Sequence, residues 1–205
     1  MNTRLIAPIA GFDENGVYGI GPHLPWGRED GRSAIKLDMG RVVQVTRDTL
    51  LAEGKKNILV MGRKTIESMG WRSLPKRRTI VVSQTVDEKE VNANRSPEDR
   101  IAVALNTRQA IDRALELEDC GHIFLFGGET VWLEGLTGNL CNAAFITVVK
   151  CDSVALSLHK EGDVRKLPHM LLDETFTGMN CETTPMKDMW GETEVNLEFR
   201  NYIKP

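Results

Sequence analysis

The stretch His122-Ile-Phe-Leu-Phe-Gly-Gly-Glu-Thr-Val-Trp132 decides the fold that we predict for this chain. Its residues 123–126 form an uninterrupted apolar run, which fits a short strand buried on both faces of a sheet. Gly127 and Gly128 end the run, and glycine accepts positive φ and lets another molecule approach the backbone. Residues 129–133 then read as the first turns of a helix. This strand, turn and helix N-terminus suit a phosphate or pyrophosphate, although a simple tight turn explains the glycines equally well.

Length and composition favour one small-molecule-binding domain. The 205 residues predict a single domain over 1–205. The net charge is only −3 and the charges are dispersed, which argues against nucleic acid or a membrane as a partner. The four cysteines lack a C-x-x-C pair and indicate reduced thiols in a cytoplasmic protein, and the four histidines lack metal-ligand spacing. The apolar run near the N-terminus is too short for a signal peptide or a membrane span.

Hydrophobic patterns predict short strands that alternate with helices. Residues 12–33 read as turn and loop, 87–100 as an exposed excursion and 152–168 as irregular. The pattern predicts an α/β domain with a mostly parallel sheet and an antiparallel C-terminal edge. The expected strands are 5–11, 57–61, 79–83, 101–104, 144–149, 171–176 and 195–202; the expected helices are 34–46, 66–69 and 107–118, the last capped by Thr107.

Two residues do not fit a plain structural pattern. Trp26 lies in the loop His23-Leu-Pro-Trp-Gly27 and is either a lid over a ligand or a plug that packs the loop onto the core, and the plug is favoured. Asp38 lies among the apolar positions of the helix 34–46. Because burying a carboxylate is costly, Asp38 is either an edge residue that reaches solvent or a functional group. The periodicity does not decide between the two.

A second strand also runs through glycine into a helix. Residues 57–61 are followed by Gly62-Arg-Lys-Thr65, which places two cations beside a helix N-terminus with the hydroxyl of Thr65 available as a cap. Solvated surface charge is the plain explanation. Two such turns in one small domain nevertheless suggest a ligand with phosphates at separate points, such as a dinucleotide with an extra phosphate.

Short blocks across the whole chain resemble dihydrofolate reductase when they are taken in order. Any single block is weak, but their order and spacing make the resemblance specific. The blocks are Leu24-Pro-Trp26, Asp38 with Thr46, Val60-Met-Gly-Arg-Lys-Thr-Ile-Glu-Ser68, Leu74-Pro-x-Arg77, Phe126-Gly-Gly128, Phe145-Ile-Thr147 and, more weakly, Gly162-Asp163 with Leu167-Pro168.

The resemblance implies a three-layer fold with helices on both faces of the sheet, in a cytoplasmic monomer. It implies NADPH-dependent reduction of 7,8-dihydrofolate to tetrahydrofolate, with hydride transfer to C6 and protonation at N5, and it implies antifolates as inhibitors. Two alternatives stay open. One is an NADPH-dependent reductase of another pterin or pyrimidine substrate, and the other is a non-catalytic binding or assembly protein that retains the fold.

The resemblance also implies roles for individual residues. Asp38 would be the catalytic acid, with its pKa raised by an apolar cleft, and Leu24 and Trp26 would belong to a mobile loop. Arg77 would bind the α-carboxylate of the substrate, Thr147 would hydrogen-bond Asp38, and a cis peptide would join Gly127 to Gly128. The implied substrate-binding set is Ile9, Asp38, Val42, Ser68, Met69, Leu74, Arg77, Phe126, Trp132 and Thr147; the implied cofactor-binding set is Ala10, Ile20, Arg63, Lys64, Thr65, Ser83, Gln84, Gly127, Gly128, Glu129, Thr130 and Val131, and no metal ligand is implied.

The chain departs from the family pattern near its acid. An insertion between Trp26 and Asp38 makes Asp30 a rival for the catalytic acid. Helical spacing and the position of Thr46 favour Asp38. Val42 stands where an aromatic residue is usual, which predicts a wider pocket there. Glu129 replaces a common third glycine, Trp132 stands where Tyr or Phe is frequent, and Gly40 weakens the helix.

Overall fold

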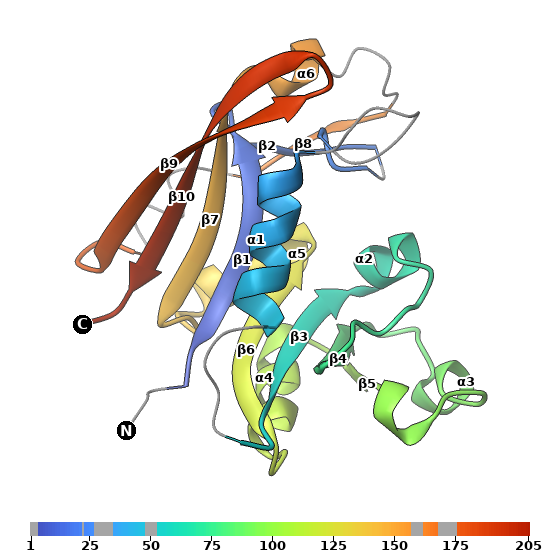
Figure 1. Ribbon diagram of the computed structural model, residues 1–205. Coiled ribbons are helices and arrows are strands. Elements are labelled where there is room, and N and C mark those ends of the chain that lie inside the picture. The colour runs from blue at the N-terminus through green and yellow to red at the C-terminus, as the bar shows by residue number, and fades with distance from the viewer. Residues whose placement is uncertain (1–3, 22, 27–34, 48–52, 157–161, 168–175) are drawn as a thin grey trace. The chain divides into compact units, whose positions relative to one another are not determined.

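The computed structural model describes residues 4–21, 23–26, 35–47, 53–156, 162–167 and 176–205 (Figure 1). Ten strands lie in this part of the chain: β1 Ile6–Asp13, β2 Val17–Ile20, β3 Lys56–Gly62, β4 Arg77–Val82, β5 Ile101–Ala104, β6 Cys120–Gly127, β7 Ala143–Lys150, β8 Val164–Lys166, β9 Asn180–Trp190 and β10 Thr193–Ile203. The helices are α1 Lys36–Arg47, α2 Arg63–Ser68, α3 Glu88–Val91, α4 Thr107–Leu115, α5 Glu129–Thr137 and α6 Ser153–Leu156, with a 3-10 turn at Pro97–Asp99.

Eight strands form one sheet in the order β5-β4-β3-β6-β1-β7-β10-β9, and β2 pairs with β8 in a second, two-stranded sheet. The pairs β4–β5, β3–β4, β3–β6 and β1–β6 are parallel, whereas β9 and β10 are antiparallel. The predicted α/β class, with a mostly parallel sheet and an antiparallel C-terminal edge, is confirmed. Contacts divide the chain into two compact units, and the single domain over 1–205 stays a prediction.

Unit 1 consists of Met1–Ile9 and Val45–Ala143. Its central strands β3 and β6 are apolar throughout their middles, where residues 58–61 and 123–125 have no exposed surface. Such runs fit strands that are covered on both faces. Helices α4 and α5 pack against these strands and against each other. α4 contributes one apolar stripe, made of Ala110, Ile111 and Ala114.

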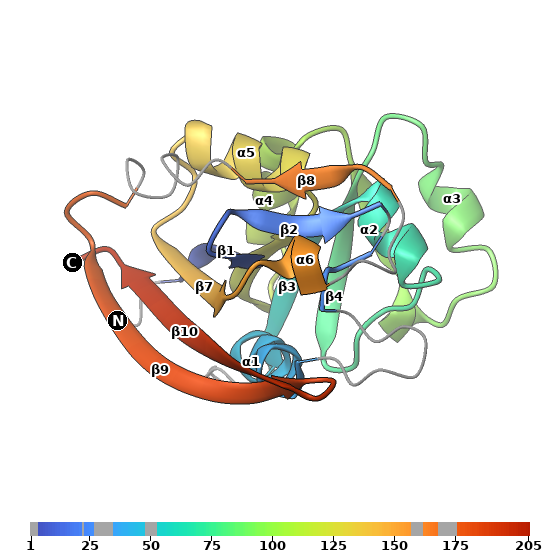
Figure 2. The ribbon, with the colours of Figure 1, turned by 90° about the horizontal axis from the view of Figure 1, so that it is seen from above.

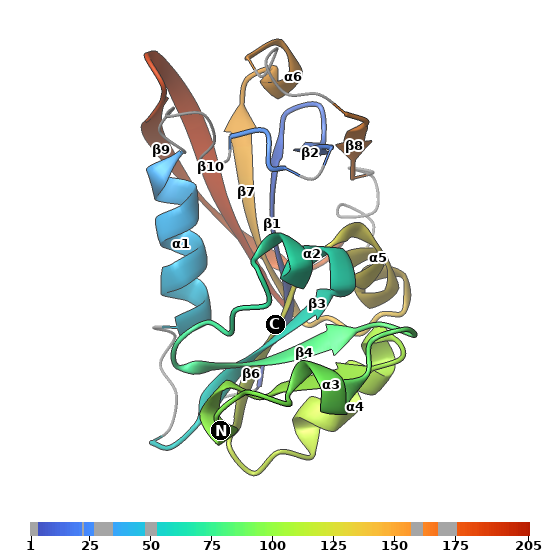
Figure 3. The ribbon, with the colours of Figure 1, turned by 90° about the vertical axis from the view of Figure 1, so that its right-hand side faces the viewer.

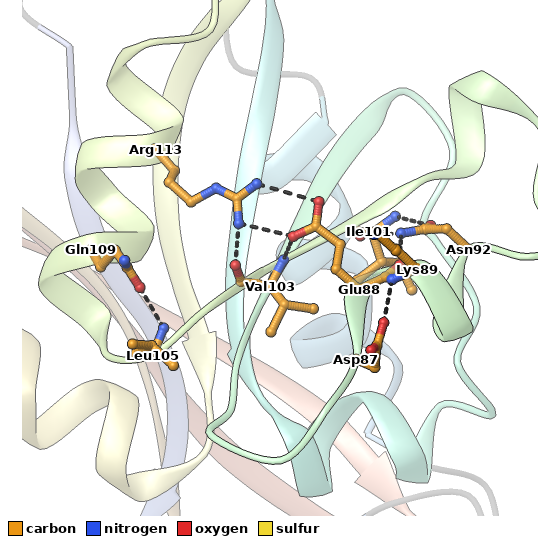
Figure 4. A network of polar contacts seen from close by, with 9 residues as sticks. All are labelled: Asp87, Glu88, Lys89, Asn92, Ile101, Val103, Leu105, Gln109 and Arg113. Carbon is orange, nitrogen blue, oxygen red and sulfur yellow. Dashed lines mark hydrogen bonds and ion pairs between the residues drawn. The ribbon is translucent and has the colours of Figure 1, made fainter.

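Three predictions in unit 1 need correction. Residues 87–100 are no plain excursion, because they contain α3. Figure 4 shows how Glu88 ties α3 to the sheet: its carboxylate accepts hydrogen bonds from Arg113 of α4 at 2.9 Å and from the main chain of Val103 in β5 at 2.8 Å. The cap of α4 is Asn106, whose side chain accepts from the amide of Gln109, and not Thr107. That helix ends at Leu115, before the predicted 118.

Unit 2 consists of Ala10–Gln44 and Ala144–Pro205. Figure 3 shows α1 alongside β9 and β10, and the amide of Leu37 donates to Asp188 of β9 at 2.7 Å. Figure 2 shows β2 and β8 side by side. The core of this unit is an apolar cluster of Trp26, Ile35, Val149, Trp190, Val195 and Leu197.

The structure adds elements to unit 2 that the hydrophobic pattern missed: β2, β8, α6 and β9. β9 is exposed along most of its length, so it has no apolar face to signal a strand. β1 also runs two residues beyond the predicted end, since the buried carboxylate of Asp13 accepts from the amides of Asn15 and Val17 and so makes the turn itself. The strand predicted at 171–176 lies outside the described residues except for Phe176, which is in a turn.

Candidate functional site

Three strands of unit 1 end together at one edge of the sheet. Gly62 of β3 is the register partner of Val82 in β4, and Met61 of β3 is the partner of Gly127 in β6. The residues that follow these strands therefore leave the sheet side by side. The carboxyl edge of a parallel sheet is the usual place for a ligand in α/β folds.

Two of the turns at this edge meet through glycine. A Cβ added to Gly62 would lie 3.8 Å from the amide nitrogen of Gly128, and one added to Gly128 would lie 3.5 Å from the hydroxyl of Thr65. The peptide between Gly127 and Gly128 is cis, as the resemblance implied, and Gly127 has φ of 135°. Side chains at these positions would fill the space between the turns. Because glycine has no side chain, the space between the turns is a cradle lined by backbone atoms.

The helix that follows the glycines begins at Glu129, as predicted. Gly128 is its N-cap and contributes no side-chain hydrogen bond to the first turn. Val131 is buried, whereas Thr130 is exposed. Trp132 packs under the turn: its Nε1 donates to the carbonyl of Leu125 at 2.9 Å, and a Cβ on Gly127 would lie 3.3 Å from its ring. In this position Trp132 shapes the turn from the inside of unit 1.

Cations lie where α2 begins. The helix starts at Arg63, so Thr65 is its third residue and does not cap it; the N-cap is Gly62. Arg63 and Lys64 are exposed, and Arg63 forms a 2.6 Å ion pair with Glu67 one turn later. On the neighbouring strand end, Ser83 accepts from the amides of two residues in its own turn, Thr85 and Val86, and Gln84 is exposed.

Arg77 is the buried cation of unit 1. Only 7% of its surface is exposed. Its Nη1 donates to the hydroxyl of Thr46 at 2.7 Å and its Nε to the carbonyl of Pro75 at 3.2 Å. These two bonds fix the plane of the guanidinium. The residues predicted to line the substrate channel are half-buried at Met69 and Leu74 and exposed at Ser68, whose hydroxyl donates to the carbonyl of Thr65.

Asp38 lies in the first turn of α1 in unit 2 and is 4% exposed. An edge residue reaching solvent is therefore excluded. Trp26 Nε1 donates to Oδ2 of Asp38 at 2.9 Å, and Trp26 itself has no exposed surface. The plug interpretation of Trp26 is confirmed, since its ring belongs to the apolar cluster. The same ring supplies the indole N–H that orients the acid. The rival Asp30 lies outside the described residues.

Gly11 makes room for this pair, and sequence reasoning missed it. A Cβ on Gly11 would lie 3.1 Å from the Trp26 ring and 3.4 Å from Oδ1 of Asp38. Glycine inside a strand often marks such a close approach. That rule was the available signal, because Gly11 interrupts an otherwise apolar strand.

Burial raises the pKa of Asp38, because desolvation disfavours the carboxylate. Three neighbours act in the opposite direction on this pKa: hydrogen bonds from Trp26 and Thr147, and the charge of Arg41. The direction of the shift is the one that the apolar surroundings predict, and Thr147 is among the groups that act on this carboxyl group. A carboxyl group of this kind is suited to hold a proton nearer neutral pH than an exposed aspartate does.

Arg41 is the second residue that the sequence did not reveal. It is 7% exposed and its guanidinium donates to acceptors on β7 and β10. Val42 beside it is half-buried. Of the other predicted site residues, Ile9 of unit 1 is buried and Phe126 is half-buried, while in unit 2 Ala10 and Ile20 are buried and Leu24 is 40% exposed.

The described residues contain neither a membrane-spanning helix nor a cluster of metal ligands. No helix there is both long enough and apolar enough to cross a membrane. Likewise, no group of three or more His, Cys, Asp or Glu side chains in that part of the chain could hold a metal ion.

Comparison with known proteins agrees with these features. Residues 5–164 match the family model described as dihydrofolate reductase. The bifunctional dihydrofolate reductase-thymidylate synthase of Paramecium tetraurelia is 29% identical over 73% of this chain and 28% of that protein. A human herpesvirus 8 protein named after dihydrofolate reductase is 33% identical over 65% of this chain and 60% of the viral protein. Dihydrofolate reductase type 5 of Escherichia coli is 30% identical over 66% of this chain and 68% of its relative. This chain thus matches less than two thirds of the length of the Paramecium and herpesvirus proteins.

Proposed function

The chain belongs to the dihydrofolate reductase family, and we propose that it reduces 7,8-dihydrofolate to tetrahydrofolate with NADPH. The proposal includes hydride transfer to C6 of the pterin and protonation of N5. It also includes that the chain is a cytoplasmic monomer and that antifolates bind in its substrate site.

The observation that carries the proposal is the buried acid of unit 2. Protonation of N5 needs a group that still holds a proton near neutral pH, and burial raises the pKa of Asp38 toward that range. Trp26 holds one carboxylate oxygen from a fixed direction. Asp38 would bind N3 and the 2-amino group of the pterin and assist protonation. The hydride-transfer rate should therefore fall as pH rises through the pKa of Asp38.

The backbone cradle of unit 1 fits the cofactor. Bound NADPH would supply the hydride. Phosphate oxygens need closely spaced donors and no intervening side chains, which the Gly127-Gly128 turn and the uncapped start of α5 provide. Thr65 presents its hydroxyl to the same turn. Arg63 and Lys64, with Ser83 and Gln84 at the neighbouring strand end, would bind the 2′-phosphate and so select NADPH over NADH.

The polar tail of the substrate would meet Arg77. A guanidinium whose plane is already fixed loses little freedom when it binds a carboxylate with two parallel hydrogen bonds. In unit 1 the p-aminobenzoyl part would contact Ser68, Met69 and Leu74, and in unit 2 the substrate would contact Val42. Because Val42 replaces an aromatic residue, it should leave more room beside the substrate than is common in the family.

The test is the oxidation of NADPH at 340 nm with dihydrofolate, for the wild type and Asp38→Asn. The variant keeps the size of the side chain but cannot supply a proton, so turnover near pH 7 should fall by about 10²- to 10⁴-fold. Its affinity for NADPH should not change. Asp112→Asn, on the exposed face of α4, is the matched control and should keep full turnover.

Each result has a defined meaning. Unchanged turnover in Asp38→Asn would overturn the assignment of the acid. A wild type that binds NADPH but does not reduce dihydrofolate would point to another pterin or pyrimidine substrate. A wild type that binds neither ligand would identify a non-catalytic protein that retains the fold.

A further inference from the structure

Arg41 lies one turn after Asp38 on α1, so the two side chains share one face of the helix. A buried guanidinium needs partners. Arg41 Nη1 donates to the carbonyl of Ile146 at 2.6 Å and to the hydroxyl of Thr147 at 3.1 Å, both on β7. Its Nη2 donates to the carbonyl of Arg200 at 3.2 Å and to the side-chain oxygen of Asn201 at 2.7 Å, both on β10.

The aromatic ring of Phe199 completes the surroundings of Arg41. The guanidinium carbon is 4.4 Å from the centre of this ring, a distance at which a cation is attracted to the π face. The four oxygens that accept from Arg41 all belong to neutral groups. None of these four contacts therefore pairs the positive charge of Arg41 with a carboxylate.

The chemistry of the donors determines where the Thr147 proton goes. A guanidinium has only donors, so Thr147 Oγ1 must be the acceptor in its contact with Arg41. The hydroxyl hydrogen is then directed to another partner, and Thr147 hydrogen-bonds the Asp38 carboxylate. The result is a directed chain from Arg41 N–H to the Thr147 hydroxyl and from that hydroxyl to the acid.

We propose that Arg41 is a positioning residue for the acid: it orients the Thr147 hydroxyl as a donor to Asp38 and supplies the counter-charge of this buried carboxylate. It acts through Asp38 and does not touch the reacting atoms. The inference rests on the proposed function for its kinetic consequence. The effect on Asp38 itself follows from the contacts within unit 2.

The other charged groups of the surrounding elements are engaged elsewhere. Asp188 of β9 accepts from the Leu37 amide. Glu198 of β10 binds both Arg200 and Lys150. Arg41 is the one charge among the causes that shift the pKa of Asp38, and Asp38 is the one charge that acts on the pKa of Arg41, which burial lowers to about 10. Arg41 hence stays protonated over the whole range in which the acid titrates.

The experiment measures the pKa of Asp38 directly. The ¹³C resonance of its carboxyl group, identified by its loss in Asp38→Asn, is followed from pH 4 to 10 in protein without added ligands. Arg41→Met removes the charge and the donors but keeps a long side chain. The pKa of Asp38 should rise by about one unit or more, as expected when a nearby opposite charge that favours the carboxylate is removed. Arg41→Lys keeps the charge, and the pKa should stay close to that of the wild type.

The kinetic arm follows the rate of NADPH oxidation against pH. In Arg41→Met the fall in rate should move to higher pH by the same amount, with KM for NADPH unchanged. Asn201→Ala loosens Arg41 without removing it, and it should give a smaller shift in the same direction even if Arg41→Met does not fold. An Asp38 pKa that is the same in the wild type, Arg41→Met and Asn201→Ala would overturn the inference. Arg41 would then serve only to connect α1 to β7 and β10. An NMR shift in a protein without dihydrofolate turnover would uphold the inference and reject the proposed function.

Discussion

The Gly127-Gly128 turn of unit 1 is built from main-chain atoms, whereas the Asp38 site of unit 2 is built from side chains. The turn consists of main chain without side chains: Gly127 has a φ of 135°, which other residues rarely adopt, and a Cβ added to it would lie 3.3 Å from the Trp132 ring. The acid site consists of side chains: a buried carboxylate that accepts from Trp26 and whose pKa is also lowered by Thr147 and by the charge of Arg41. The turn accordingly tolerates few substitutions but has no charge to desolvate. The acid site carries a charge that is costly to bury. The carboxylate that serves the proposed reaction should therefore lower the stability of the fold.

The strongest test of this contrast is Gly127→Ala. A Cβ at φ of 135° is strained and would lie 3.3 Å from the Trp132 ring. The free energy of unfolding should fall by about 1–3 kcal/mol, and NADPH should bind at least about tenfold more weakly. Denaturant unfolding and fluorescence titration measure the two effects. Gly40→Ala is the control in α1, because its Cβ meets nothing within 4 Å, and it should stabilise the protein by up to about 1 kcal/mol. Equal NADPH affinity in Gly127→Ala and the wild type would contradict a backbone-made site.

The second prediction concerns the stability of Asp38→Asn. The pKa of Asp38 is higher in the folded state, so the folded state binds the proton more tightly than the unfolded chain. Its contribution is favourable at pH values below the unfolded pKa and is lost as pH rises through the folded pKa. At pH 8 the variant should therefore be more stable than the wild type by about 1 kcal/mol, and at pH 4 the difference should nearly vanish. Thermal unfolding at both pH values measures it. A destabilised variant at pH 8 would mean that the carboxylate stabilises the fold.

The strands and turns of unit 1 are easier to predict from sequence than the side-chain site around Asp38. The apolar runs of β3 and β6 are visible in sequence because both faces of these strands are covered. The two strand-to-helix turns were found through their glycines. Helix starts were less exact: α2 begins at Arg63 rather than after Thr65, since the main chain turns at Gly62 without a side-chain cap.

The surroundings of the acid were harder to predict because they depend on contacts far apart in the chain. Arg41 reads as an ordinary surface charge on a helix, and its burial is possible only because β7 and β10 present oxygens more than a hundred residues away. β9 has no apolar period, and β2 is four residues long with a glycine inside. The family resemblance located Asp38 and Thr147, but the third partner, Arg41, emerged only from the tertiary structure.

A third prediction tests a titratable group that serves structure alone, in unit 1. His122 Nδ1 accepts from the amide of Leu5 at 3.0 Å, and burial, with the charge of Arg4, lowers the pKa of His122. A neutral ring in the folded state means that stability is complete above the unfolded pKa and is lost as pH falls toward the folded pKa. His122→Asn keeps an acceptor that does not titrate. Between pH 7 and 5.5 this variant should lose less unfolding free energy than the wild type. The difference should be under about 1 kcal/mol, because one proton changes the unfolding free energy by at most about 1.4 kcal/mol per pH unit. An unchanged slope in His122→Asn would refute the prediction.

The smallest expected effect lies at the rim of the proposed cofactor site. Arg63 is held by Glu67 at 2.6 Å, and both side chains are more than a third exposed, so this ion pair contributes little to stability. Glu67→Gln should change the free energy of unfolding by at most about 0.5 kcal/mol. It should also release Arg63 toward the 2′-phosphate and raise NADPH affinity by about twofold, which corresponds to about 0.4 kcal/mol. NADH, which lacks that phosphate, should bind as before, and Glu194→Gln, which breaks the exposed pair with Lys187, should change neither affinity. An equal gain for NADH and NADPH would show that Arg63 does not read the phosphate, and selection of the cofactor would then depend on Lys64 and the strand end at Ser83.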